Sequence, residues 1–210
     1  MKRNLTLRVE SLLTQFPVVC ILGARQVGKT TLARQIRPDW RYVDLQKPSD
    51  RDRILADPEW FFQENPQHLI LDEAQMHPVI FDVLRGVIDA DRPCKGRFII
   101  TGSSSPDLLK HISESLAGRA AVVELGGLKA NEIAEVPLSN FYQWFTQPLA
   151  SWTRDQLSIT TPPLIRSIIE KAWFGGGYPE VVLAGNTEIR NNWFEFYEKS
   201  YLYPLLSGLI

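Results

Sequence analysis

The sequence predicts an α/β fold built on a parallel β-sheet, because five short apolar runs alternate with segments of helical periodicity. The first run, PVVCIL, is continuous and β-branched, which is typical of a strand buried on both faces. The predicted strands cover residues 17–22, 41–45, 68–71, 97–101 and 120–125. Only helical patterns follow the Gly126-Gly127 pair. We therefore expect an α/β core over residues 1–126 and a helical segment over residues 127–210.

Apolar residues at helical spacing fill the intervals between these strands. Within residues 80–88 they recur at the i, i+3, i+4, i+7, i+8 positions of a helix that buries one face. Ser105 and Pro106 are the residue types preferred at an N-cap and in a first turn, so another helix begins there. The helices are predicted near residues 5–13, 29–36, 48–65 (one or two helices), 80–88, 105–116, 162–173 and 187–202.

The composition is that of a globular chain and excludes several classes of protein. Hydrophobic residues make up 44% and charged residues 22%, which is enough apolar mass for a core. The 23 basic and 24 acidic residues give a net charge of −1, so the basic excess of a nucleic-acid-binding protein is missing. Cys20 and Cys94 form no short motif, which favours a reducing compartment. The apolar run at residues 16–24 is about half of a membrane span, and no secretory signal is evident. We expect a cytoplasmic protein.

The sharpest motif is the run GARQVGKT at residues 23–30, which matches the phosphate-binding pattern G-x-x-x-x-G-K-[ST]. Its glycines permit a tight turn that brings backbone N–H groups onto phosphate oxygens, and the following helix directs its positive end at the same anion. Lys29 is expected to reach the β- and γ-phosphates, and the Thr30 hydroxyl is expected to bind Mg²⁺. The residues expected to contact the nucleotide are Gly23, Ala24, Arg25, Gln26, Val27, Gly28, Lys29, Thr30 and Thr31.

An acidic pair, Asp72-Glu73, ends the predicted strand HLIL. Beside a phosphate-binding loop, Asp72 is expected to hold Mg²⁺, directly or through a coordinated water. Glu73 is expected to accept a proton from the attacking water as a general base. An acidic pair at a strand end is common by itself, so the phosphate-binding loop is what gives this pair its predicted role.

Hydroxyl-bearing residues lie at the end of the fourth predicted strand, in the run TGSSS at residues 101–105. Ligands of parallel α/β sheets bind at the carboxyl ends of the strands, so Thr101 or Ser103 is placed to sense a γ-phosphate or to position the water. Ser105 is expected to be a helix N-cap instead. Arg119 lies just before the fifth strand and has two interpretations: a surface arginine, or a cation supplied to the γ-phosphate of a neighbouring subunit.

Five segments of the chain, taken in order, resemble the AAA+ superfamily of P-loop ATPases. Within it, the chain is similar to the bacterial and archaeal ATPases that carry a C-terminal domain of unknown function. The matching segments span most of the chain and are GARQVGKTTL (23–32), LILDEAQ (69–75), ITGSSS (100–105), SLAGR (115–119) and GGYPE (176–180).

The resemblance implies a P-loop NTPase fold with strand order 5-1-4-3-2, ATP and Mg²⁺ as ligands, and a helical lid after the core. It implies a sensor-1 role for Ser103 or its neighbour and raises Arg119 to a candidate arginine finger. Such proteins continue into a further domain, so we expect this chain to be truncated before it. Neither Arg166 nor Arg190, the arginines of the predicted lid, sits in the motif of a sensor-2 residue.

The function predicted from these residues is hydrolysis of MgATP to ADP and phosphate as a conformational switch. Two alternatives stay open: a nucleotide-binding sensor or scaffold with little hydrolysis, and a P-loop kinase. The expected partners are ATP and a second copy of the chain. The second copy would contact this one through the surface around Arg119 and through the apolar C-terminal segment, residues 193–210. Neither a membrane nor a nucleic acid is an expected partner.

Overall fold

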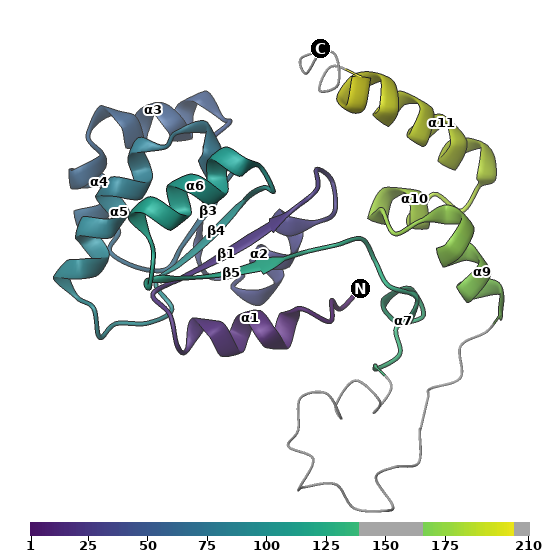
Figure 1. The fold of residues 1–210 in the computed structure, drawn as a ribbon, viewed down its shortest axis with the longest axis horizontal. Helices are drawn as coiled ribbons and strands as arrows, with labels where there is room; N and C mark the ends of the chain where they lie inside the picture. The colour runs from purple at the N-terminus through teal and green to yellow at the C-terminus, as the bar shows by residue number, and fades with distance from the viewer. Residues whose placement is uncertain (139–165, 204–210) are drawn as a thin grey trace, which may run out of the picture. The chain divides into compact units, whose positions relative to one another are not determined.

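The computed structural model describes residues 1–138 and 166–203, without the side chain of residue 202. The chain forms two compact units. One unit is Leu5–Gly126, and the other is Gly127–Ile210 together with Met1–Asn4. Figure 1 shows the ribbon coloured along the chain. The helix predicted over residues 162–173 begins outside the described residues, and residues 204–210 of the apolar C-terminal segment lie outside them.

A five-stranded parallel sheet forms the centre of the first unit. Its order is β2-β3-β4-β1-β5, which confirms the predicted order 5-1-4-3-2. Strand β1 lies between β4 and β5, and all six of its residues are buried. This explains the unbroken apolar run that predicted it, because a strand covered on both faces needs no polar alternation. The strands are β1 (Val18–Gly23), β2 (Arg41–Asp44), β3 (Leu69–Asp72), β4 (Phe98–Ser103) and β5 (Ala120–Glu124).

Helices cover both faces of this sheet (Figure 1). Helices α1 and α2 lie on one face, and α3 to α6 lie on the other. Two helices, not one, occupy residues 48–65, because Pro58 begins a new helix and the side chain of Asp57 caps it by accepting from the Trp60 N–H. The helices are α1 (Thr6–Leu13), α2 (Lys29–Ile36), α3 (Pro48–Ala56), α4 (Pro58–Glu64), α5 (Val79–Ala90) and α6 (Pro106–Ser115), with a 3₁₀ turn η1 (Ala74–Met76).

The core of the first unit joins alternate residues of the strands to the helices α3 to α6. Phe62 of α4 makes edge-to-face contacts with Phe61 and with Phe98 of β4, at centroid distances of 5.3 and 6.0 Å. Such close packing holds the strand ends in fixed positions. The largest fully buried side chains are Phe61, Phe62, Phe81, Phe98, Ile21, Leu32, Leu45, Ile54, Leu69, Ile70, Leu71 and Ile80.

The second unit is helical in the part that the structure describes. It contains α7 (Ala130–Ile133), α9 (Arg166–Gly175), α10 (Pro179–Leu183), α11 (Thr187–Tyr197) and a π-helical turn η4 (Glu198–Leu202). An aromatic row on α11 and η4 packs on Tyr178, which lies 4.9 Å from Trp193 and 5.3 Å from Tyr197 between ring centroids. The rings of Trp193 and Tyr197 stack at 4.8 Å, and Tyr201 continues the row.

The first four residues belong to the second unit because polar contacts bind them to α7. The Arg3 guanidinium lies 3.2 Å from the Glu132 carboxylate, and both side chains are nearly buried. The same carboxylate accepts from the backbone N–H of Asn4 and of Lys129. Among the described residues, no helix has the length and apolar character needed to cross a membrane.

Candidate functional site

Three loops meet where β1, β3 and β4 end. Because the strands are parallel, their carboxyl ends lie at one edge of the sheet, and the register pairs Gly23 of β1 with Ser103 of β4. The loop over residues 23–30, the pair Asp72-Glu73 and the segment 101–105 therefore gather at this edge. Sequence motifs separated by up to 82 positions thus form one site in the folded chain.

The loop that joins β1 to α2 needs glycine at two positions. Gly28 has φ 94° as the N-cap residue of α2, in the left-handed region that favours glycine. At Gly23, a Cβ atom would lie 2.3 Å from the backbone oxygen of Leu125. The backbone can therefore curl tightly beneath the first turn of α2, where the N–H groups and the helix dipole favour an anion.

The Lys29 side chain closes this loop. Its Nζ donates to the backbone oxygens of Gly23 at 3.1 Å and Ala24 at 2.9 Å, and the residue is only 5% exposed. Burial lowers the pKa of the Lys29 ammonium, while the carboxylates of Glu73 and Asp72 act in the opposite direction. A cation held among backbone carbonyls is well placed for phosphate, which would offer it a charge-assisted hydrogen bond.

Asp72 accepts hydrogen bonds from three hydroxyl groups. Thr30 donates to Oδ2 at 2.8 Å, Tyr42 donates to the same oxygen at 2.7 Å, and Thr101 donates to Oδ1. The carboxylate is nearly buried, so these donors replace the water that it loses. Burial and the hydrogen bond to Asp72 together raise the pKa of the Tyr42 hydroxyl. The start of α2, β2 and β4 are thereby all joined to the end of β3.

The oxygens of Thr30 and Asp72 fit a magnesium ion. Both are hard donors, and Mg²⁺ is commonly held by one or two protein oxygens together with substrate phosphates. Among the residues that the structure describes, no group of three or more His, Cys, Asp or Glu side chains is arranged to hold a metal ion. The pair therefore fits a cation that is shared with a phosphate ligand, not one enclosed by the protein.

Glu73 follows Asp72 in a strained conformation. Its φ of 55° and ψ of 43° are left-handed, which costs a non-glycine residue about 1–2 kcal/mol. Such residues gather at functional sites, where the surrounding structure holds them. The Glu73 carboxylate accepts a 2.5 Å hydrogen bond from Nε2 of Gln75, two residues further on.

The hydroxyl residues at the end of β4 and just after it have different roles. Ser105 is the predicted N-cap of α6, since its Oγ accepts from the backbone N–H of Leu108. Thr101 is fully buried, and its hydroxyl is bonded to Asp72. Ser103 ends β4 beside Gly23 and is partly exposed, so its predicted role as a sensor stays a prediction.

Arg119 lies near the amino ends of the strands, opposite the end that carries the loop over residues 23–30. It immediately precedes β5, whose first residue pairs with Val18 at the start of β1, so five strand steps, or about 17 Å, separate this register from Gly23. Its guanidinium donates to both carboxylate oxygens of Asp89, at 2.8 and 2.7 Å. This bidentate pairing lowers the pKa of Asp89. The structure thus does not bring Arg119 to the loop of its own chain.

Two residues of the site were not assigned a role from the sequence. Tyr42 reaches Asp72 from the neighbouring strand, and Gln75 reaches Glu73 from the turn after β3. A tyrosine inside a short predicted strand gives no sign of its partner. Gln75 lies in the quoted segment LILDEAQ, so its motif was visible although its contact was not.

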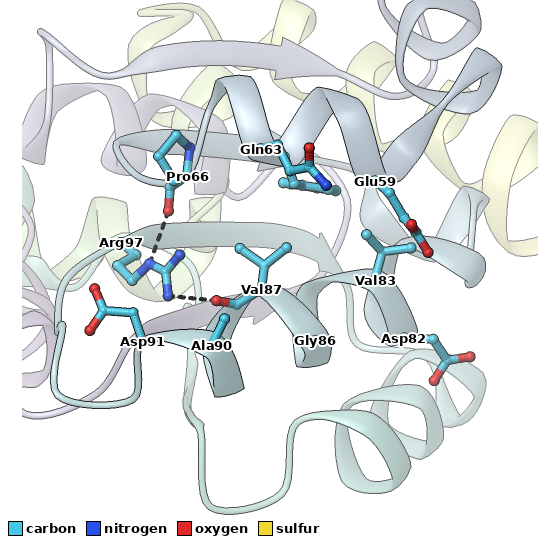
Figure 2. A pocket seen from close by; sticks show the side chains of 11 residues that line it. Glu59, Gln63, Pro66, Asp82, Val83, Gly86, Val87, Ala90, Asp91 and Arg97 are labelled. Carbon is cyan, nitrogen blue, oxygen red and sulfur yellow. Dashed lines mark hydrogen bonds between the residues drawn. The ribbon is translucent and has the colours of Figure 1, made fainter.

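A cavity of about 500 Å³ between α4 and α5 lies away from this site (Figure 2). Arg97 contributes to its wall and donates to the backbone oxygens of Pro66 and Val87, both at 2.9 Å. Pro66 and Arg97 come just before β3 and β4, so this wall lies near the amino ends of these strands. Parallel α/β sheets bind their ligands at the carboxyl ends, so the loop over residues 23–30 is the better candidate for the functional site.

Three solved structures have the same fold as this chain. A Walker-type ATPase of Pyrococcus abyssi matches 97% of this chain and 73% of its own length, with 15% identity and a TM-score of 0.56. A signal transduction ATPase with numerous domains from Pyrococcus horikoshii matches 87% of this chain and 29% of its own, with 17% identity and a TM-score of 0.53. AMPPCP-bound DnaA of Aquifex aeolicus matches 93% and 62%, with 14% identity and a TM-score of 0.51. These likenesses establish the P-loop NTPase fold.

Sequence comparison gives closer relationships. Uncharacterized proteins of Mycobacterium tuberculosis and Mycobacterium bovis are each 33% identical to this chain over 205 residues. The match covers 96% of this chain and 38% of each relative, so the chain spans well under half the length of these proteins. A family described as "AAA domain" matches residues 15–134, which contain the whole sheet and the three loops of the site. The chain therefore belongs to this AAA domain family.

Proposed function

We propose that this chain binds MgATP at the loop over residues 23–30 and hydrolyses it to ADP and phosphate. The observation that carries the proposal is the meeting of Lys29, the Thr30–Asp72 pair and Glu73 at one sheet edge. Each group has a separate task in phosphoryl transfer to water, and two segments supply them: Lys29 and Thr30 come from the start of α2, and Asp72 and Glu73 come from the end of β3.

Binding would rest on the backbone and on Lys29. The N–H groups at the start of α2 cradle the phosphates, and the Lys29 ammonium exchanges its carbonyl partners for phosphate oxygens. Thr30 and Asp72 would hold Mg²⁺, which neutralises charge on the phosphates when it is bound. Tyr42 and Thr101 keep the Asp72 carboxylate in one orientation.

Catalysis would rest on Glu73 as the general base. A base of this kind contributes about 10²–10⁴-fold to a rate when it is held within reach of the proton. It directly follows Asp72, the residue proposed to hold the metal, and its charge influences the pKa of Lys29. Ser103 is proposed to contact the γ-phosphate or the attacking water from the end of β4.

We further propose that Arg119 acts on the nucleotide of a second copy of the chain. It lies at the far edge of the sheet from its own loop, so an effect on a γ-phosphate has to be in trans. Self-association through the C-terminal helices is supported by exposed apolar side chains there: Trp173, Phe174, Ile189 and Phe196 are 52–83% exposed. The nucleotide state would then be read by the helical second unit as a conformational switch.

A nucleotide-binding sensor with little hydrolysis is the second candidate, and one contact favours it. Arg119 is held in a bidentate pair by Asp89, and this pairing competes with any contact to a neighbour's nucleotide. The sensor would bind MgATP as the ATPase does but would turn it over slowly.

Turnover of MgATP without any added acceptor separates these functions. We expect phosphate release by the unmodified chain and a rate at least about a hundredfold lower for Glu73→Gln, with ATP affinity retained. Glu114→Gln, an exposed glutamate of α6, is the matched control and should change neither quantity. Tight binding with no phosphate release would support the sensor, and equal rates for Glu73→Gln and the unmodified chain would refute Glu73 as the base.

A further inference from the structure

The amide of Gln75 is fixed between the end of β4 and the Glu73 carboxylate. Its Nε2 donates to Oε2 of Glu73 at 2.5 Å. Its Oε1 is buried and has no hydrogen-bond partner among the described residues. On the other side, a Cβ atom at Gly102 would lie 2.5 Å from this Oε1, so only glycine leaves the amide its space.

This arrangement allows the amide only one orientation toward Glu73. Turning the group over would place its carbonyl oxygen against a carboxylate oxygen, which removes the hydrogen bond and brings two acceptors together. The buried, unsatisfied Oε1 is costly by itself, and the charge-assisted bond to Glu73 offsets it. The contact therefore has a preferred direction, from Gln75 to Glu73.

We propose that Gln75 is a positioning residue that orients Glu73 for proton abstraction, an inference that rests on the proposed ATP hydrolysis. A glutamate side chain on a turn samples several rotamers, and a misplaced base loses rate steeply. The hydrogen bond to Oε2 fixes the plane of the carboxylate and leaves Oε1 to accept the proton. The left-handed backbone of Glu73 and the close approach of Gly102 to Gln75 hold the two ends of this contact.

The direct test replaces Gln75 by methionine, which has a similar length and no polar group. We expect the kcat for MgATP to fall by roughly tenfold. The KM and the affinity for MgADP, measured by titration calorimetry, should stay within about twofold, because Gln75 is not a phosphate ligand. Gln63→Met, at an exposed glutamine of α4, is the control and should leave all three quantities unchanged.

A double variant shows whether Gln75 acts through Glu73. In the Glu73→Gln background, the change Gln75→Met should alter the remaining rate by less than about twofold, because the group that it positions is already lost. Gln75→Glu keeps the shape but replaces the donor by an acceptor, so it should not restore the kcat.

The outcomes separate this inference from the proposed function. No turnover by the unmodified chain would overturn both. Turnover that depends on Glu73 but is the same or faster in Gln75→Met would overturn only the role of Gln75. An equal loss in both backgrounds, or a KM that rises with the fall in kcat, would also overturn it. A thermal unfolding midpoint measured for each variant confirms that the rates refer to folded protein.

Discussion

The hydroxyl of Thr30 donates a 2.8 Å hydrogen bond to Oδ2 of Asp72, and 42 positions separate the two residues in the chain. The bond joins the first turn of α2 to the end of β3 at the sheet edge where parallel strands bind ligands. It also brings together the two oxygens that would hold a magnesium ion beside bound phosphate. The fold itself therefore joins the two residues that are proposed to share the metal.

Removing the hydroxyl of Tyr42 should destabilise the core unit. Tyr42→Phe leaves the nearly buried Asp72 carboxylate with one donor fewer, and a hydrogen bond to a charged group contributes about 1.5–3 kcal/mol. We expect the free energy of unfolding in urea to fall by about 1–2 kcal/mol. Ser113→Ala removes an exposed hydroxyl of α6 and should change it by less than about 0.5 kcal/mol. A loss no larger than that of Ser113→Ala would show that Asp72 does not depend on Tyr42.

Two glycine-to-alanine changes in the same unit should have opposite effects. Gly23→Ala places a Cβ 2.3 Å from the Leu125 oxygen, so we expect a loss of about 2 kcal/mol or more and weaker nucleotide binding. Gly86→Ala lies in the exposed middle of α5 with no atom within 4 Å of the new Cβ, and should gain about 1 kcal/mol from helix propensity. Denaturant unfolding measures both. A Gly23→Ala protein as stable as Gly86→Ala would contradict the packing at the loop.

Mixing two inactive variants tests the role of Arg119 in trans. Arg119→Ala retains the base and Glu73→Gln retains the arginine, so a mixed interface regains both groups and some ATP turnover should return. Asp89→Ala releases the guanidinium from its bidentate pair and should raise turnover per chain. Phosphate release is measured over a range of total protein concentrations. No recovery on mixing, with a specific activity independent of concentration, would return Arg119 to a structural role.

The motifs allowed much of the core to be predicted from sequence. The motif at residues 23–30 and the acidic pair after HLIL are each expected at the carboxyl end of a strand in a parallel sheet. The order of the strands followed from the family resemblance. What sequence could not supply was contact between side chains. The Gln75–Glu73 bond depends on a left-handed turn at a residue that is not glycine. The Tyr42–Asp72 bond depends on the order of the strands: after β1 the chain forms β2 at the edge of the sheet, and β3 then pairs beside it.

The contact between Arg119 and Asp89 was likewise not predictable from the sequence. Its position before β5 was predicted, and that position puts it at the amino edge of the sheet. Its partner Asp89 lies on α5, whose apolar stripe predicted the helix but not which polar residues of the other face meet a neighbour. Periodicity reports the buried face of a helix and says little about pairs between exposed residues.

Titration of the protein with MgATP by calorimetry, comparing the unmodified chain with Lys29→Ala and Lys95→Ala, tests the central claim most directly. The Lys29 ammonium donates to the backbone of the loop over residues 23–30, whereas Lys95 is an exposed lysine whose Nζ bonds only to the Arg92 oxygen among the described residues. We predict that Lys29→Ala stays folded by circular dichroism and binds MgATP at least about a hundredfold more weakly, the scale of a lost charge-assisted contact with phosphate. Lys95→Ala should bind as the unmodified chain does. Equal affinity of all three proteins for MgATP would contradict the assignment of residues 23–30 as the nucleotide-binding loop.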